Sequence, residues 1–253
     1  MKQYGKLYKQ QRGNGMFFKK KKSGAVELKL NEDQFCAVLE EKAPDVTRKY
    51  CVIANADNYN LLYRDGRFLG MPKPFGGAIY PFSMDPTQEG SNKDKNKFHT
   101  AKIVCLSKDF NLKVYWGTET PFMMEDPVTR EAYRVGARGV FYVNIDPDDA
   151  ARKADMFYSK CLTQRNAELF NTEALRDFLR EAFIIQIGAR IQKYMEKNGR
   201  TLSNYVGLQP SEILEISKEL CPEVSDIFGS YGLTIVKQSS AGSILQGLIV
   251  EKV

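Results

Sequence analysis

The sequence predicts an α/β protein of the α+β kind, in which a twisted, mainly antiparallel sheet is followed by a unit of helices and strands. Three observations favour this class. Short apolar runs interrupted by Gly and Pro occupy residues 25–145, a helical spacing of apolar residues begins after Asp146, and a strand-like run returns at Tyr231. A strand-rich half followed by helices is typical of two layers packed around a core.

Charge divides the chain into an arm and a body. We expect a basic flexible arm over residues 1–24, a β-rich subdomain over 25–145 and an α/β subdomain over 146–253. The arm holds eight of the 37 Lys and Arg residues and no acidic residue, which leaves 29 basic and 31 acidic residues for the body. Because nucleic-acid-binding domains spread basic residues over a folded face, the near-neutral body gives no sign of a specific nucleic-acid site.

The end of the arm combines aromatic rings with a run of lysines. Each basic residue near an anionic leaflet contributes on the order of 1 kcal/mol, and aromatic rings prefer the membrane interface. The alternative is a solvated arm, because runs of like charge are usually solvated. The residues of this candidate membrane or anion contact are Phe17, Phe18, Lys19, Lys20, Lys21 and Lys22.

The β-rich half contains one clear turn signal and several alternating runs. A short first strand is expected over 25–30. Asp65-Gly66 lies between apolar runs in 59–71 and predicts a hairpin, because both central positions of a type I′ turn need positive φ. Strands are expected over 98–107 and 111–117, as neighbours across a short turn. In 131–145, the residues expected to share one face are Tyr133, Val135, Ala137, Gly139, Phe141 and Val143.

The helical half has three predicted helices. The first spans 146–161, with Asp146 as N-cap and Pro147 in the first turn. The second spans 171–199 and ends at Asn198-Gly199. A third lies within 209–229 and is expected to break at Pro222, and a strand follows over 231–240. Apolar runs at 183–191 and 243–250 are too short to span a bilayer.

The second helix carries more apolar residues than one buried face needs. Most of this group is expected in the core, but the excess makes Ile184, Ile187 and Ile191 candidates for a protein interface.

Residue types that support catalysis or metal binding are sparse. Five cysteines are widely spaced without a C-x-x-C pair, which argues against a disulfide framework and a zinc site. The single histidine, His99, opens a strand and has no ligand at metal-binding spacing. Asp146, Asp148 and Asp149 could hold a hard cation, but carboxylates at a helix start are favoured by the helix dipole alone. We therefore predict no catalytic residue, no metal and no cofactor.

The segment "KVYWGTETPFMMEDP" at 113–127 carries a family resemblance. Its Trp-Gly-Thr-x-x-Pro and Asp-Pro elements, with "YRVGARGVFYVNIDP", "NLLYRDGRFL" and "FGSYGLTIVKQS", resemble the SPFH (Band-7; stomatin, prohibitin, flotillin) superfamily, in its soluble bacterial virion-core-protein-like branch. The resemblance covers about residues 50 to 240, but "MPKPFGGAIYPF" replaces the usual Gly-Pro-Gly-Arg turn. It implies structural roles for a signature of Asp65, Gly66, Trp116, Gly117, Thr118, Pro121, Asp126 and Pro127, with Trp116 over a sheet edge and Met123 and Met124 filling the gap beneath.

The resemblance implies a non-enzymatic scaffold that self-associates or docks partners at the cytosolic face of a membrane. The expected partners are further copies of the chain, a membrane protein or an anionic lipid surface, and the expected location is the cytoplasm, peripheral to the inner face of the plasma membrane. Two alternatives stay open: a nucleic-acid-binding protein that uses the arm, and an enzyme without a recognisable motif.

Overall fold

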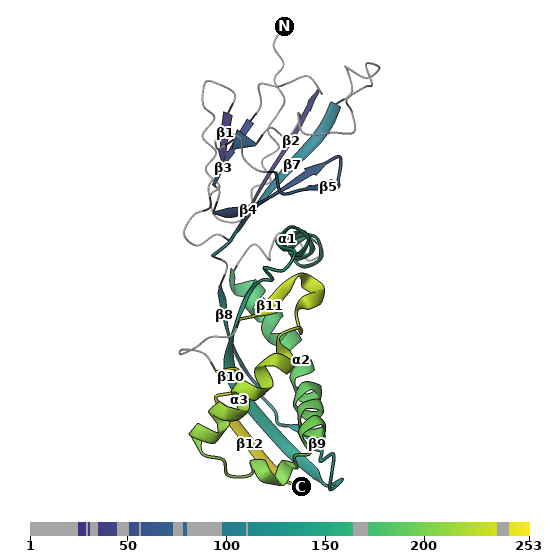
Figure 1. Ribbon diagram of the computed structural model, residues 1–253, viewed down its shortest axis with the longest axis vertical. Coiled ribbons are helices and arrows are strands. Elements are labelled where there is room, and N and C mark those ends of the chain that lie inside the picture. Colours follow the sequence, from purple (N-terminus) through teal and green to yellow (C-terminus); the bar gives the residue numbers. More distant parts are fainter. Residues whose placement is uncertain are drawn as a thin grey trace. The chain divides into compact units, whose positions relative to one another are not determined.

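The computed structural model describes residues 25–28, 30, 35–44, 51–55, 57–72, 78–79, 98–109, 111–163, 172–236 and 243–253. The chain has an α+β fold, as predicted, and forms two compact units (Figure 1). Unit 1 comprises residues 1–110 and 147–172, and unit 2 comprises 111–146 and 173–253. The predicted boundary at residue 145 is therefore wrong, because residues 111–146 pair with strands from the C-terminal part of the chain.

Unit 1 contains two sheets. In the first, β3 (Cys51–Ala54) pairs with β1 (Ala25–Leu28) in parallel and with β6 (Ala78–Ile79) in antiparallel orientation. The second is antiparallel, in the order β2 (Cys36–Pro44), β7 (Phe98–Ser107), β4 (Asn58–Arg64) and β5 (Arg67–Gly70). Strands β1 and β7 were predicted from the sequence, whereas β2, β3 and β6 were not.

One apolar cluster joins the two sheets of unit 1. Both sheets contribute to it, and its buried members are Ala37, Leu39, Val52, Leu62, Ile79, Ile103 and Cys105. Burial raises the pKa of the Cys105 thiol to about 12, so this cysteine stays protonated at neutral pH. A face-to-face pair of sheets with a shared core is therefore the basis of unit 1.

The Asp65-Gly66 hairpin is confirmed. Both residues have positive φ, 47° at Asp65 and 80° at Gly66, as a type I′ turn requires. The Asp65 backbone N–H donates to the carbonyl of Thr100, and its carboxylate Oδ1 accepts from the Thr100 N–H at 2.9 Å. This turn therefore also ties the β4–β5 hairpin to β7.

Helix α1 (Ala150–Met156) and the π-helical turn η2 (Phe157–Leu162) pack on the four-stranded sheet. Tyr63 on β4 donates a 2.6 Å hydrogen bond to Asp155 and lies 5.5 Å from the Tyr158 ring. Burial, together with this hydrogen bond, raises the pKa of Tyr63 far above its usual range. The helix starts at Ala150 with Asp149 as N-cap, so the prediction of Asp146 as the cap was wrong by three residues.

Unit 2 is built around one long strand, β10 (Ala132–Ile145). One of its edges pairs with β8 (Leu112–Gly117) and β9 (Phe122–Glu125), and the other pairs with β11 (Leu233–Ile235) and β12 (Gly247–Lys252). All four pairings are antiparallel. The expected pairing of 98–107 with 111–117 was wrong, since β7 and β8 belong to different sheets.

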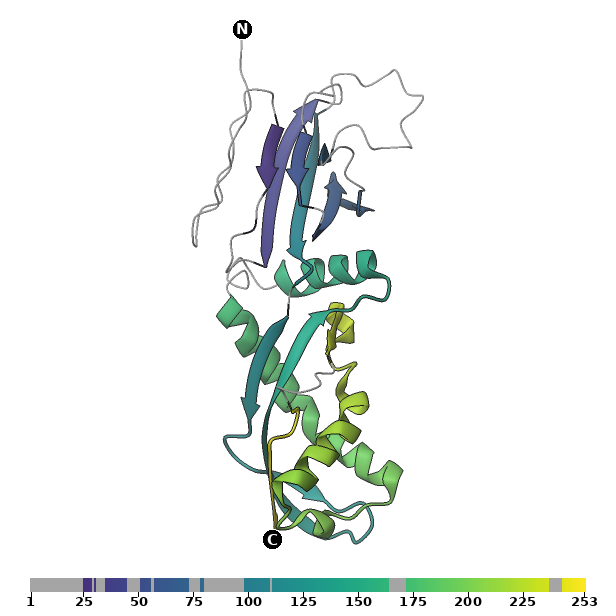
Figure 2. The same ribbon diagram turned by 60° about the vertical axis from the view of Figure 1, so that its left-hand side comes forward.

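The helices of unit 2 lie on one side of this sheet (Figures 1 and 2). They are α2 (Thr172–Asn198), the 3-10 turn η4 (Leu202–Tyr205), α3 (Pro210–Val224) and the 3-10 turn η5 (Gly229–Tyr231). Pro222 lies inside α3, which continues to Val224, so the expected break at Pro222 was wrong. No described helix combines the length and the apolar composition that a bilayer crossing requires.

The alternation predicted for β10 is confirmed. The six residues expected on one face are all buried, and Phe141 stacks at 4.5 Å on Phe183 of α2. Phe228 joins this pair, with its ring 5.7 Å from Phe141. Aromatic rings at these separations contribute about 0.5–1.5 kcal/mol per pair beyond the area that they bury.

Candidate functional site

Strands β8 and β9 form one interrupted edge of the sheet in unit 2. Thr118, just beyond β8, keeps the ladder to β10 going: its N–H donates to the carbonyl of Ala137, and its hydroxyl accepts from the Ala137 N–H at 3.0 Å. A short excursion at 119–121 follows before β9 begins. The two strands are therefore successive segments of one edge, joined by a bulge-like turn.

Trp116 is held in the core of unit 2 by a glycine opposite it. Gly139 is its cross-strand partner on β10, and the indole Nε1–H donates a 2.9 Å hydrogen bond to the carbonyl of Ile244. A Cβ on Gly139 would lie 1.9 Å from that carbonyl oxygen. The indole also lies 4.9 Å from the Phe183 ring. Trp116 thus joins the β8 edge, α2 and the segment before β12.

We expect Trp116→Phe to lower the free energy of unfolding by about 1–3 kcal/mol, because the Ile244 carbonyl loses its buried donor. Tyr115→Phe is the matched control, since the Tyr115 side chain is 64% exposed. Thermal unfolding followed by circular dichroism measures both variants. Equal stability of the two would contradict the role assigned to the indole N–H.

Asp126 ties the end of β9 to the turn that follows α2. Its carboxylate is fully buried and accepts the backbone N–H groups of Val128 and Thr129 at 2.8 Å and that of Leu202 in η4. Burial raises the pKa of this carboxyl, but the three N–H donors outweigh burial and hold the pKa below its usual value. The carboxylate therefore acts as a structural anchor, with Pro127 in the turn that it closes.

Met123 and Met124 were both expected to fill the gap beneath Trp116, but the structure places only one of them there. Met124 is buried beneath the sheet, but Met123 is 57% exposed. Because successive side chains alternate between faces of a strand, only one of the two can fill the gap. The Pro121 ring packs near Gly136, because a Cβ added to Gly136 would lie 3.7 Å from it. Gly117 lies close to Arg138, because a Cβ added to Gly117 would lie 3.4 Å from the Arg138 Cβ.

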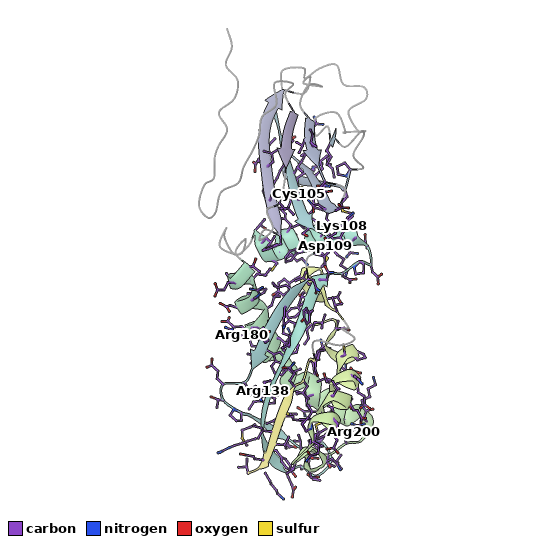
Figure 3. All side chains as sticks on the ribbon, turned by 90° about the vertical axis from the view of Figure 1, so that its left-hand side faces the viewer. Cys105, Lys108, Asp109, Arg138, Arg180 and Arg200 are labelled. Carbon is purple, nitrogen blue, oxygen red and sulfur yellow. The ribbon has the colours of Figure 1, made fainter. Side chains whose placement is uncertain are left out.

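A groove of about 1090 Å³ runs between this edge and α2. Residues 115–120 and 122–124 line it from the strand side. The α2 side is one stripe of the helix at spacings of three and four residues: Glu181, Ile184, Ile185, Gly188, Ala189 and Gln192. Arg180 of α2 also lines the groove beside this stripe. Figure 3 labels Arg180 on α2 and Arg138 on β10.

The groove exposes large apolar side chains. Ile185 is 81% exposed, Tyr115 64% and Met123 57%, and Ile184 is half-buried. Gly188 lets the Phe122 ring pack closely on α2, because an added Cβ at Gly188 would lie 3.2 Å from that ring. Adjacent exposed apolar residues on a soluble surface are typical of a protein-binding or ligand-binding site.

The structure corrects the predicted interface on α2. Ile187 is fully buried and Ile191 is 8% exposed, so both belong to the core and cannot contact a partner. Of the three predicted residues, only Ile184 lines the groove. Ile185 was missed, although the spacing of 181, 184, 185, 188 and 189 marks a second helical stripe beside the buried one.

The remaining predicted sites are distributed as follows. The arm residues Phe17, Phe18 and Lys19 to Lys22 lie outside the described residues. His99 lies on β7, opposite Ala43 of β2. Within the described part of the chain, no three His, Cys, Asp or Glu side chains come together as metal ligands would.

Comparison of the chain with models of known protein families, with curated proteins and with solved structures found no match.

Proposed function

We propose that the protein is a non-enzymatic interaction scaffold whose groove between the β8–β9 edge and α2 receives a protein partner. The observation that carries the proposal is the exposure of Ile185, at 81%, across the groove from the exposed side chains of Tyr115 and Met123. The SPFH resemblance implies the same class of function.

A displayed library of random short peptides, selected on the full chain, tests this proposal. We expect peptides whose affinity falls at least about tenfold for Ile185→Glu, since a charge at the centre of an apolar contact costs about 1.4 kcal/mol or more. Leu214→Glu on α3 is the matched control, because Leu214 is exposed, at 45%, and does not line the groove. Fluorescence anisotropy measures the affinities. Failure to obtain peptides that distinguish the two variants would remove the proposal.

Self-association belongs to the same scaffold proposal. We expect the mass of the protein in solution to rise with concentration, as sedimentation velocity would show. A constant monomer mass would eliminate self-association and restrict the scaffold to other partners.

The membrane-facing location rests on the arm. Phe17, Phe18 and the four lysines that follow would attach the protein weakly to the anionic cytosolic face of a membrane. Sedimentation with anionic liposomes, with and without residues 2–22 and at two salt concentrations, separates this contact from other uses of the arm. Unchanged binding after the deletion would exclude the arm as an anchor.

A further inference from the structure

We infer that the groove binds its partner as an added β-strand, in which an extended peptide segment pairs with the outer edge of β8. This inference rests on the proposed function and specifies the partner chemistry of the same groove. Strand addition is a general way to recognise peptides, in which the main chain provides affinity and alternate side chains provide selectivity.

The backbone groups of β8 show which residues would pair with such a strand. On β10, the Arg138 carbonyl accepts from Gln246, the Val140 N–H donates to Ser243 and the Tyr142 carbonyl accepts from Val236. These three residues therefore point their hydrogen-bonding groups away from β8. The intervening residues Gly139 and Phe141 point theirs toward β8, where they meet Trp116 and Val114.

The alternation leaves the N–H and C=O groups of Lys113, Tyr115 and Gly117 on the outer edge of β8. One contact supports this assignment: the Arg176 side chain of α2 donates a 3.2 Å hydrogen bond to the Lys113 carbonyl. No described strand other than β10 pairs with β8. Tyr115 and Gly117 both line the groove, so their outward backbone groups face the space that the partner would occupy.

The shape of the groove favours an extended segment over a second folded copy. Paired strands lie about 4.7–4.9 Å apart, whereas packed helices need about 8–10 Å between their axes. Because α2 already lines the space beyond β8, a copy that paired through its own β8 would bring its own α2 into the same space. A single extended strand has no such helix and can lie over Ile184 and Ile185.

Charge and alternation define the sequence of the partner. Side chains at every second position would face Ile184 and Ile185 of α2, and those between them would lie on the face that carries Tyr115 and Lys113. The Lys113 ammonium rests 4.6 Å from the centre of the Tyr115 ring. Lys113 forms no ion pair within the described residues. The partner is therefore an extended segment with apolar residues at alternate positions and an acidic residue next to Lys113.

A scan of backbone N-methylation on peptides selected against the wild-type chain tests the inference. Methylation removes one N–H donor at a time. We expect losses of about fivefold to tenfold or more at alternate positions, whose N–H groups would pair with Tyr115 and Gly117, and changes within about twofold at the positions between them. Replacement of the acidic residue next to Lys113 by lysine should weaken binding further.

Amide hydrogen exchange of the full chain supplies a second readout. Bound peptide should slow exchange at Tyr115 and Gly117, while Val114 and Trp116, which already pair with β10, should change little.

The outcomes separate the two proposals. Peptides that depend on Ile185 but show no two-residue period in the scan, and leave exchange at Tyr115 and Gly117 unchanged, would overturn strand addition and leave the groove as a binding site. Absence of any peptide that depends on Ile185 would overturn both.

Discussion

Gly139→Ala is expected to destabilise unit 2 by about 3 kcal/mol or more. The added Cβ would lie 1.9 Å from the carbonyl oxygen of Ile244, 2.6 Å from its carbonyl carbon and 3.0 Å from the carbonyl oxygen of Ser243. All three atoms belong to the backbone, so no side-chain rotation can relieve the clash. Moving the Ile244 carbonyl would also break its hydrogen bond to Trp116.

Gly136→Ala is the matched control for this prediction. It lies three residues away on the same strand, and its added Cβ would meet its nearest neighbour at 3.7 Å, an ordinary contact. Its effect should stay within about 1 kcal/mol. Trp116 is the only tryptophan of the chain and lies in unit 2, so its fluorescence during denaturation reports the unfolding of that unit. Similar denaturation midpoints for Gly139→Ala and Gly136→Ala would contradict the prediction, because they would show that the segment at 243–244 can move away from β10.

Asp126→Ala should cost about 3–5 kcal/mol, because the buried N–H of Leu202 and the partly buried N–H groups of Val128 and Thr129 would lose a charged acceptor at once. Asp126→Asn should cost about 2–3 kcal/mol, since an amide can accept with its oxygen but presents a donor to one remaining N–H. Asp177→Asn on α2 is the control. Its carboxylate forms an exposed ion pair with Arg180, of the kind that contributes about 0–1 kcal/mol.

Acidification tests the same anchor through its charge. The folded-state pKa of Asp126 is lowered, so the ionised carboxylate stabilises the fold above the unfolded pKa of about 3.9 and this stability is lost as the pH falls through the folded pKa. The free energy of unfolding of the wild type should therefore decline below about pH 4. Asp126→Asn, which cannot ionise, should decline less over the same range, and parallel declines would contradict the assignment.

Local signals predicted local structure well. Asp65-Gly66 gave its hairpin because two adjacent positive φ values are accessible to few residue pairs. The alternation in β10 and the apolar period of α2 were also visible in the sequence, because one face of each is buried against the other. The Trp116 segment was recognised as structural, and its indole and the Asp126 carboxylate are both buried and hydrogen-bonded.

Long-range pairing was not visible in the same way. A short turn after β7 suggested that β7 and β8 are neighbours, but nothing local to residues 108–111 shows that β8 pairs with β10 in another unit. Strand β12 was missed because a mixed apolar run at 243–250 has no clear two-residue period. The groove was missed for a related reason: Ile185 is indistinguishable from its buried neighbours until the position of β8 beside α2 is known.

The pairing of β10 has a consequence for synthesis of the protein on the ribosome. Residues 133–138 find their β12 partners at 247–252, more than a hundred positions later in the chain. Contacts of such long sequence separation form slowly and late. One side of β10 must therefore stay open while α2 and α3 are being made, and this interval is when the nascent chain is most exposed to mispairing and to capture by chaperones.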